Sequence, residues 1–280
     1  MGSAADYFRE RFPLPVVITL SVGTAIWLVA TSTTEVPTQT NYFITFLITV
    51  AFTAFLLRQR VMDEFKDRSH DDANYPNRPV QRGVITHKQL KPIGFIAFLI
   101  ELSAVSSIAI FTNSWFSLLA YLAVLIFSTL TAYEFFAAQW LNRHFTLYFL
   151  SHQLIFVFFY LWSLTIFGVQ YSIQAVLNGL AFILSMAALE VMRKFEIRKN
   201  ASGEVVQDTY LAVWGRPVSV AVLALCLALS GYFLGGFSYC LGLLGVLAGL
   251  LIVLVSKSNR FVQAATIVGF FTIGLVAFFS

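Results

Sequence analysis

The chain has 280 residues, of which 58% are hydrophobic and only 11% charged, with 29 Phe and a formal net charge of +4. So little polar surface excludes an ordinary water-soluble globular domain. Nine continuous apolar windows recur along the chain, each close to the roughly 20 residues that a helix needs to cross a membrane. Because apolar and polar residues do not alternate within these windows, we expect an all-α integral membrane protein and not a β-barrel. The windows are roughly 14–30, 42–57, 93–111, 115–132, 145–167, 173–189, 217–234, 237–255 and 261–279.

The first window is preceded by only 13 residues, which carry both acids and bases. It is long enough to stay in the membrane, so we expect no separate signal peptide. The two cysteines, Cys226 and Cys240, lie within or beside expected spans. A disulfide or a thiolate metal site is therefore not expected.

The basic residues predict an orientation. All 18 Lys and Arg lie in the N-terminal tail or in the connections after the second, fourth, sixth and eighth windows. Positively charged connections stay in the cytoplasm, so we expect the N-terminus and segments 58–92 and 190–216 there. The C-terminus is expected on the opposite side of the membrane. If the protein is bacterial, that membrane is expected to be the inner membrane. Bases that face anionic lipids also explain the positive charge without a nucleic-acid partner.

The stretch "MDEFKDRSHDDANYPNRPVQRG" at residues 62–83 gathers charge directly behind an apolar run. If the second helix continues past the membrane boundary, the four-residue spacing of Asp63, Asp67 and Asp71 places them on one face. Carboxylates stacked about 6 Å apart repel one another unless a cation lies among them. Oxygen ligands suit Mg²⁺, or Mn²⁺. The spacing therefore predicts a divalent-cation site.

Basic side chains accompany these acids. Arg78 and Arg82 follow the aspartates, and Lys66 and Arg68 lie between them. Such groups donate well to phosphate oxygens, so the whole stretch suits a metal-bridged diphosphate. The alternative is a solvated juxtamembrane turn in which neighbouring acids and bases pair locally. The third aspartate in register and the Arg-Pro pair after it favour the site.

The stretch resembles the first aspartate-rich motif of the UbiA superfamily of intramembrane prenyltransferases, N-D-x-x-D-x-x-x-D followed by R-P-x-x-x-G. The nine windows and two long cytoplasmic segments also fit that family. The resemblance implies one domain over residues 1–280, built as a bundle of nine transmembrane helices around a central cavity open to the cytoplasm. It also implies metal ligands at Asp63, Glu64, Asp67 and Asp71 and catalytic roles for Asp67, Asp71 and Arg78, with Gly83 in the motif's tail.

The family's second motif, D-x-x-x-D, is altered here to "LEVMRKFEIRKNASGEVVQDTY". Lys194 and Ile197 stand where aspartates are expected. Glu190 is either a ligand of a second metal or the partner of Arg193 or Lys194 on its own helix, and both alternatives stay open. The cations of this segment, Arg193, Lys194 and Arg198, suit direct contact with a diphosphate.

Further candidates lie in and beside other spans. Tyr133 and Arg143 are the nearest equivalents of a tyrosine and a basic pair that help hold the diphosphate in the resembling family. Glu134 is either a cavity carboxylate or, as slightly favoured here, an interfacial partner of Arg143. An ionisable group at the centre of a span costs about 2.5–3.5 kcal/mol, so Glu101 and His152 are expected to face the bundle interior. We expect a packing role for His152, and Glu101 is a weaker candidate for a cavity acid.

The expected function is Mg²⁺-dependent ionisation of an allylic isoprenyl diphosphate and transfer of the prenyl group to an aromatic or lipid acceptor. Two alternatives remain: a membrane terpene cyclase that acts on the diphosphate alone, and a non-catalytic isoprenoid-binding or transport protein. The retained Asp67 and Asp71 argue against the last. A CDP-alcohol phosphotransferase is set aside because its D-G-x-x-A-R signature is absent. Diphosphate contacts are expected from Lys66, Arg78, Arg82, Tyr133, Arg143, Arg193 and Lys194.

Overall fold

The computed structural model describes residues 4–33, 38–234 and 239–279, and within these ranges it is helical, with a single isolated bridge and no strand. Seven helical segments are long and apolar enough to cross a membrane, and α6 and α13 are shorter apolar helices. The nine apolar windows fall on these helices wherever the structure describes them. The fold is therefore all-helical, with the character of an integral membrane protein. The bounds are α2 Leu14–Ser32, α3 Gln39–Lys66, α5 His87–Phe111, α6 Phe116–Ala132, α8 Phe145–Gln153, α9 Ile155–Phe167, α10 Ile173–Arg193, α12 Gly215–Leu234, α13 Tyr239–Leu254 and α14 Asn259–Phe279.

Small polar residues set several helix starts. Thr38 and Ser172 accept hydrogen bonds from the first-turn amides of α3 and α10, as N-caps do. Thr86 and Gln89 form a reciprocal capping box at the start of α5. Gly168 ends α9 in the left-handed region, with φ of 63°, a conformation that glycine adopts without a side-chain clash. These caps fix where apolar helices give way to connections.

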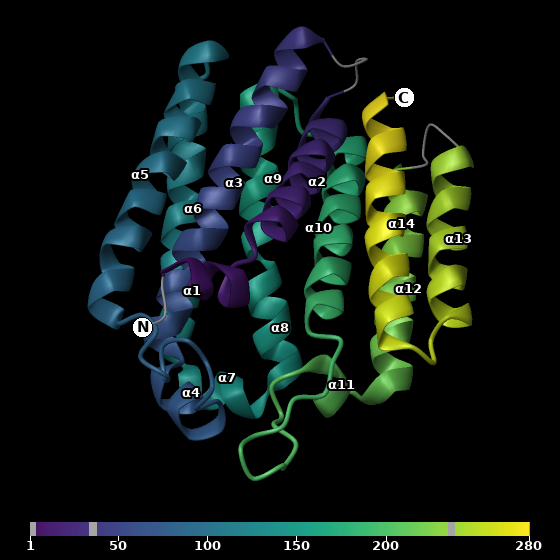
Figure 1. Ribbon diagram of the computed structural model, residues 1–280. Coiled ribbons are helices and arrows are strands. Elements are labelled where there is room, and N and C mark those ends of the chain that lie inside the picture. Colours follow the sequence, from purple (N-terminus) through teal and green to yellow (C-terminus); the bar gives the residue numbers. More distant parts are fainter. Residues whose placement is uncertain (1–3, 34–37, 235–238, 280) are drawn as a thin grey trace.

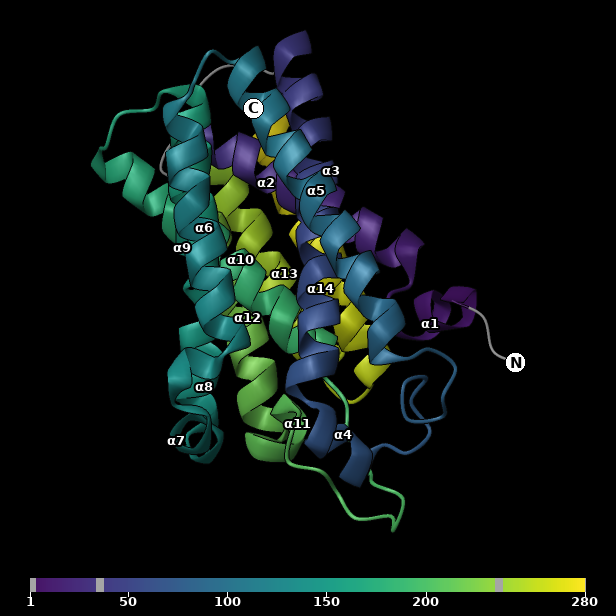
Figure 2. The same cartoon turned by 90° about the vertical axis from the view of Figure 1, so that its left-hand side faces the viewer.

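The packed helix pairs form a closed series, α5–α3–α2–α14–α13–α12–α10–α9–α6 and back to α5, and α2 and α10 also meet across its interior (Figures 1 and 2). Short helices gather toward one end of the bundle, together with segments 67–86 and 194–209; we call this the motif end. The last turn of α14 lies at the opposite end (Figure 1). The short helices are α1 Ala4–Arg11, α4 Arg68–Asn74, the 3₁₀ turn η1 Glu134–Phe136, α7 Ala138–Arg143 and α11 Tyr210–Val213.

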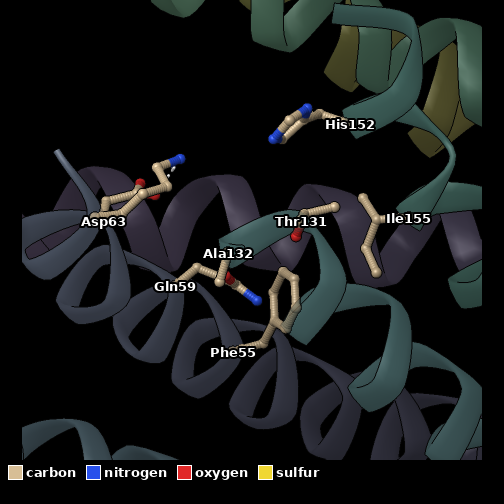
Figure 3. A pocket seen from close by; sticks show the side chains of 8 residues that line it. Phe55, Gln59, Asp63, Thr131, Ala132, His152 and Ile155 are labelled. Atoms are coloured by element: carbon tan, nitrogen blue, oxygen red, sulfur yellow. Dashed lines mark ion pairs between the residues drawn. The ribbon is translucent and has the colours of Figure 1, made fainter. Parts of the chain in front are cut away.

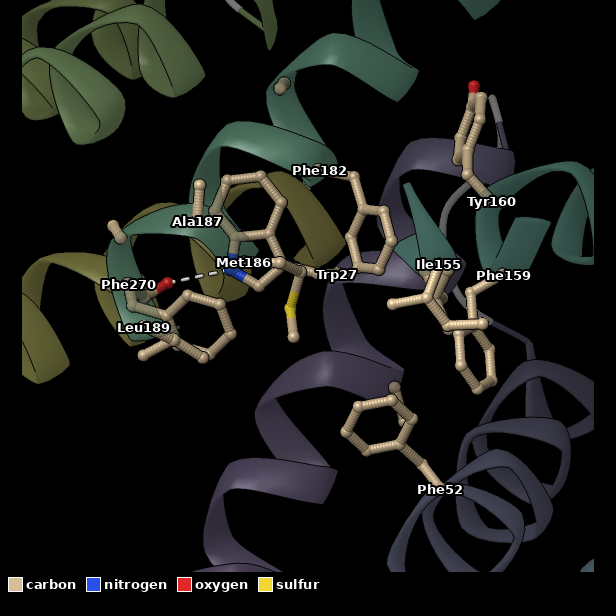
Figure 4. Packing of buried hydrophobic residues seen from close by; sticks show 14 of the residues in the cluster. Trp27, Phe52, Ile155, Phe159, Tyr160, Phe182, Met186, Ala187, Leu189 and Phe270 are labelled. Carbon is tan, nitrogen blue, oxygen red and sulfur yellow. Dashed lines mark hydrogen bonds between the residues drawn. The ribbon is translucent and has the colours of Figure 1, made fainter. Parts of the chain in front are cut away.

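A large apolar cluster fills the bundle, with the indole of Trp27 between α2 and α14 (Figure 4). Trp27 Nε1 donates a 2.9 Å hydrogen bond to the carbonyl of Phe270, and the two rings stack with centroids 5.7 Å apart. A Cβ at Gly274 would lie 2.6 Å from the indole nitrogen. The missing side chain therefore lets α14 approach the indole closely.

Helices α12 and α13 meet backbone to backbone. A Cβ at Gly245 would lie 2.8 Å from Gly231 Cα and 2.8 Å from the carbonyl oxygen of Leu227. Small residues at such a crossing let membrane helices approach closely enough for van der Waals packing.

A buried ion pair joins α3 to α5 inside the bundle. Arg58 donates to both carboxylate oxygens of Glu101, at 2.7 and 2.9 Å, and to Ser128 Oγ at 3.2 Å. Tyr121 from α6 donates to Glu101 at 2.7 Å. Glu101 is fully buried, which confirms that it faces the interior. Its carboxylate is used in packing, and Glu101 does not line the pocket described below.

Candidate functional site

A pocket of about 150 Å³ lies at the motif end between α3, α6, α8 and the start of α9. Figure 3 shows Asp63 and His152 on opposite sides of it, with Phe55 and Gln59 along α3. Ligand sites usually hold about 300–1,000 Å³, so this pocket has room for a head group rather than for a whole lipid. Its lining residues are Phe55, Gln59, Asp63, Lys66, Thr131, Ala132, His152 and Ile155.

One wall of the pocket is the ring of Phe55, which packs on further aromatic rings behind it. Phe55 packs against Phe52 and Phe159, with ring centroids 5.7 and 4.9 Å away; Phe52, Phe159 and Ile155 are seen together in Figure 4. The guanidinium carbon of Arg58 lies 5.5 Å from the Phe55 ring centroid. The pocket thus combines a polar mouth with an apolar, electron-rich wall.

Lys66, the last residue of α3, is the centre of the polar mouth. Its Nζ lies 3.3 Å from Asp63 Oδ1, 3.8 Å from Asp67 Oδ1 and 3.9 Å from Glu134 Oε1. It also donates to the hydroxyl of Tyr148 at 3.4 Å. The Lys66 side chain is only 16% exposed. Three carboxylates from α3, its C-cap and η1 therefore converge on one ammonium group.

Asp67 is the C-cap of α3, and α4 begins at the next residue. Partial burial raises the pKa of Asp67 to about 6, and the neighbouring carboxylates of Asp63 and Asp71 add to the rise although Lys66 opposes it. A raised carboxyl pKa means that the charged form is disfavoured. The mouth of the pocket therefore carries more negative charge than Lys66 neutralises.

Glu134 is directed toward Lys66 by an unusual backbone. Glu134, Phe135 and Phe136 have φ values of 48°, 52° and 58°, a left-handed conformation that costs about 1–2 kcal/mol for each such residue. This turn buries Glu134 to 8% exposure and leaves Phe136 81% exposed. The favoured expectation that Glu134 is an interfacial partner of Arg143 is therefore wrong, because its carboxylate faces the cation of the pocket.

The other two motif carboxylates lie in a second, buried group. Glu64 accepts from Arg11 at 2.9 Å and from Arg60 at 2.8 Å. Asp71 pairs with Arg78 and lies 3.8 Å from Arg11. The four-residue spacing of the aspartates is kept through the turn at Asp67, since the amide of Asp67 donates to the carbonyl of Asp63 and the amide of Asp71 donates to that of Asp67. The carboxylate of Asp71, however, pairs with arginines and not with Lys66. Helix α1 supplies one of those arginines from far away in the sequence.

A third group of charged side chains lies at the C-terminal end of α10. Glu190 pairs with Arg193 at 2.8 Å and Lys194 at 3.6 Å, and Tyr210 donates to it at 3.2 Å. Of the two alternatives for Glu190, the structure shows the local pair. Burial lowers the pKa of Lys194, helped by Arg193 and opposed by Glu190. None of Glu190, Arg193 and Lys194 lines the pocket.

The predicted metal ligands are not brought together. Within residues 4–33, 38–234 and 239–279, no group of three or more His, Cys, Asp and Glu side chains is placed to hold a metal ion. The three carboxylates around Lys66 are oxygen donors of the type that Mg²⁺ takes, but they surround an ammonium group and do not form a metal site as they stand. The need for Mg²⁺ stays a prediction. The expected ligands are divided as Asp63 and Asp67 beside Lys66, Glu64 and Asp71 among arginines, and Glu190 at the end of α10.

Of the seven expected diphosphate contacts, only Lys66 lines the pocket, and three of the others are exposed at the surface. Arg82 pairs with Glu10 at 2.8 Å, and both side chains are more than a third exposed. Tyr133 is 61% exposed, and Arg143 is exposed on α7. None of these three lines the pocket.

His152 and Tyr148 form a polar pair on α8. The Nδ1–H of His152 donates to the carbonyl of Tyr148 at 2.8 Å, and the two rings stack 4.1 Å apart. Since a carbonyl only accepts, Nε2 keeps its lone pair, and it has no partner in the described part of the chain. His152 lines the pocket, which the sequence analysis did not foresee, and Tyr148 was not singled out at all. The four-residue spacing of Tyr148 and His152, about one helical turn, was the signal in the sequence that could have indicated this pair.

Asp208 ties the two long segments of the motif end together. It accepts from Tyr75 at 2.6 Å and lies 3.6 Å from Arg198 and 3.9 Å from His70. The interaction with Asp208 raises the pKa of His70. Burial would raise the pKa of Asp208, but the contacts with His70 and Tyr75 outweigh burial, and the pKa is lowered. Segments 67–86 and 194–209 are therefore held against each other beside the pocket.

No protein-family model matches this chain, and no curated protein matches it. Among solved structures, it is similar to one described as digeranylgeranylglyceryl phosphate synthase in membranes, with 17% sequence identity and a TM-score of 0.52. The similarity covers 98% of this chain and 97% of that one. At this identity the likeness shows the fold alone. The chain therefore has, over nearly its whole length, the helical fold of that membrane synthase.

Proposed function

We propose that this protein is an intramembrane prenyltransferase, which ionises an allylic isoprenyl diphosphate and passes the prenyl group to an aromatic or lipid acceptor. The observation that carries the proposal is a charged pocket mouth built on Lys66 directly above the aromatic wall at Phe55. Two facts support it: the fold is shared with a synthase whose name describes a geranylgeranylated product, and residues 63–83 resemble the first UbiA motif.

The pocket mouth suits the diphosphate head. Lys66 lines the pocket and provides a donor there, and charge-assisted hydrogen bonds to phosphate oxygens are strong. Arg193 and Lys194, which pair with Glu190 at the end of α10, are proposed as further donors. Mg²⁺, if bound, would take oxygen donors from Asp63, Asp67 and Glu134 and would neutralise charge on the leaving diphosphate. As the C–O bond breaks, positive charge develops on the allylic carbon. The faces of Phe55 and its neighbours stabilise that charge and exclude water.

The prenyl chain and the acceptor need more room than the pocket offers. A volume of about 150 Å³ holds the head group and the first carbons, so the chain continues past Phe55 and Ile155 between helices toward the lipid. Burial of each methylene contributes about 0.8 kcal/mol. The partners are thus an isoprenyl diphosphate, a hydrophobic acceptor and membrane lipids.

The orientation expected from the basic residues is part of the proposal. It places the N-terminus and segments 58–92 and 190–216 in the cytoplasm and the C-terminus on the opposite side. The last turn of α14 lies at the end of the bundle opposite α4 and α7, which supports placing the C-terminus on the side away from the motif segments (Figure 1). In this orientation the pocket opens where soluble diphosphates are made.

The test is release of diphosphate by the purified protein in nanodiscs, with geranyl, farnesyl or geranylgeranyl diphosphate and with Mg²⁺ or EDTA. We expect Mg²⁺-dependent release that is lost in Asp67→Asn. The matched control is Asp72→Asn on α4, whose side chain is 55% exposed and pairs with Arg68 instead of Lys66. Equal loss in both variants, or silence with every chain length and a broad acceptor panel, would contradict the proposal.

The products decide between the remaining alternatives. Cyclic hydrocarbon formed without an acceptor indicates a terpene cyclase of the same fold. Tight binding of prenyl diphosphate without any release indicates a binding or transport protein. Release that requires an added acceptor indicates the transferase.

A further inference from the structure

Two polar side chains of the pocket have hydrogen-bonding atoms that the fold does not use. Gln59 Nε2 and His152 Nε2 are buried, and neither has a hydrogen-bond partner in the described part of the chain. Both residues line the pocket. Thr131, which also lines it, differs because its hydroxyl donates to the carbonyl of Ser128 at 2.8 Å. Buried polar atoms without a partner are rare in folded proteins, so these two atoms indicate a place that a ligand group occupies.

The two atoms need different partners. The Nδ1–H of His152 is already donated to the carbonyl of Tyr148, so Nε2 of the neutral ring is an acceptor and needs a donor. The amide nitrogen of Gln59 is a donor and needs an acceptor. A hydroxyl group satisfies both with one oxygen atom, since it donates one hydrogen bond and accepts others. An ammonium group cannot accept, and an ionised phosphate oxygen cannot donate. The pair of atoms therefore matches a neutral hydroxyl group.

Gln59 lies at an intermediate depth of the pocket. Phe55, Gln59 and Asp63 follow one another at four-residue intervals on α3, about 6 Å apart along the helix axis. The charged Asp63 and Lys66 are thus at the mouth, and the ring of Phe55 is deeper than Gln59. His152 reaches the same pocket from α8 (Figure 3). One water needs about 10–15 Å³, so a pocket of about 150 Å³ has room for a small organic group.

We propose that Gln59 and His152 form a subsite for the hydroxyl group of a substrate, which accepts a hydrogen bond from Gln59 Nε2 and donates one to His152 Nε2. The proposed function, on which this part rests, makes that substrate the prenyl acceptor. Its hydroxyl then lies about one helical turn deeper than the diphosphate, at the depth of the first carbons of the prenyl chain. The acceptor is therefore an alcohol or a phenol. The subsite itself does not depend on the proposed function.

The test uses the full-length protein in nanodiscs, labelled with nitrogen-15 at histidine, and p-cresol as the probe. The chain has four histidines, and the resonances lost in His152→Gln identify those of His152. We expect p-cresol to move the Nε2 resonance of His152 upfield, as a hydrogen bond to this nitrogen does. Toluene has the same ring and methyl group but no hydroxyl, so it should bind at this site at least about tenfold more weakly.

A pair of glutamine variants tests the donor. Gln59→Met keeps the length of the side chain and removes the amide, so the affinity for p-cresol should fall about threefold to tenfold and that for toluene should not fall. Gln174→Met is the matched control, since Gln174 donates to Asn178 at 2.8 Å at the start of α10 and does not line the pocket. It should leave the titration of the His152 resonance unchanged.

A second arm replaces p-cresol by 3-methylbut-2-en-1-ol, whose hydroxyl is on an aliphatic chain. A larger response to this alcohol than to p-cresol indicates an aliphatic substrate, and a smaller response indicates a phenol. Both results uphold a hydroxyl subsite at Gln59 and His152.

The inference is overturned if neither hydroxyl compound moves the His152 resonance, which would mean that water alone fills the subsite, or if toluene binds as tightly as p-cresol. These comparisons use the wild type, so they do not depend on the folding of a variant. Equal losses in Gln59→Met and Gln174→Met would also overturn it. Diphosphate release is measured separately: its absence, with the response to p-cresol intact, refutes the proposed function and leaves the subsite, whereas release without that response does the reverse.

Discussion

Replacement of Glu101 by leucine is the sharpest test of how the bundle is held together. The carboxylate of Glu101 accepts two hydrogen bonds from Arg58 and one from Tyr121 inside the bundle. Its loss leaves the guanidinium, among the described residues, with Ser128 and the sulfur of Met62 as its hydrogen-bond partners. Arg58 is about 10% exposed, so water does not replace the lost partner.

The size of the effect follows from burial. Removal of one partner of a buried ion pair costs about 3–5 kcal/mol, because the remaining charge is left uncompensated. The orphaned hydroxyl of Tyr121, which is 1% exposed, adds about 1–3 kcal/mol if it finds no new acceptor. The two costs overlap, so we expect Glu101→Leu to lower the free energy of unfolding by about 4 kcal/mol.

The assay is equilibrium unfolding in mixed micelles, with SDS as the denaturant. Glu101→Leu is compared with the double variant Arg58→Met, Glu101→Leu, which removes both charges and should recover most of the loss. Glu196→Leu is the exposed control, since its side chain is 47% exposed, and it should stay within about 0.5 kcal/mol of the wild type.

Two results would refute the reasoning. One is a loss below about 1 kcal/mol in Glu101→Leu, the range of exposed pairs. The other is a double variant no more stable than the single one, which would mean that the uncompensated charge of Arg58 is not the cause.

Three further predictions concern other parts of the fold. Gly245→Leu should separate α12 from α13 and lower the yield of folded protein in size-exclusion chromatography, whereas Gly242→Ala, whose Cβ meets no atom closer than 4.0 Å, should not. Asp71→Asn should lower the melting temperature because it leaves Arg78 without its carboxylate partner. Asp67→Asn should not lower it, since the raised pKa of Asp67 shows that the folded protein disfavours its charged form. An equal loss in both variants would contradict the assignment of Asp67 and Asp71 to two separate groups. The link between segments 67–86 and 194–209 should resist proteolysis best between pH 3.8 and 6.5. The pKa of His70 is raised in the folded protein, so the stability that His70 contributes is complete below pH 6.5 and is lost as the pH rises through its folded pKa. The pKa of Asp208 is lowered in the folded protein, so the stability that Asp208 contributes is present above pH 3.8 and is lost as the pH falls through its folded pKa. Asp208→Asn should flatten this profile, and an unchanged profile would show that other groups set it.

The helices were predictable because their signal is local. A run of apolar residues long enough to span a membrane needs no knowledge of distant partners, and windows such as 173–189 and 217–234 fall inside α10 and α12. Part of the site was predictable for the same reason. Asp63, Lys66 and Asp67 lie within one turn of the chain, and the structure keeps them together.

The remainder of the site depended on contacts that sequence spacing does not contain. Glu64 and Asp71 are held by arginines, one of which comes from α1, so regular spacing within the motif did not place them at the pocket. Glu134 reaches Lys66 only through a left-handed turn at three non-glycine residues, and no residue type announces such a turn. Both cases were decided by tertiary structure.

The contact between α1 and the motif also has a consequence for biosynthesis. Arg11 leaves the ribosome 53 residues before Glu64, and Glu10 leaves it 72 residues before Arg82. The earliest part of the nascent chain must therefore wait at the membrane surface until α3 and α4 have been made. A truncation or a bulky fusion that displaces α1 would leave every apolar helix intact. It would still remove Arg11, the cation shared by Glu64 and Asp71, so a change at the N-terminus should be chosen to keep this arginine in place.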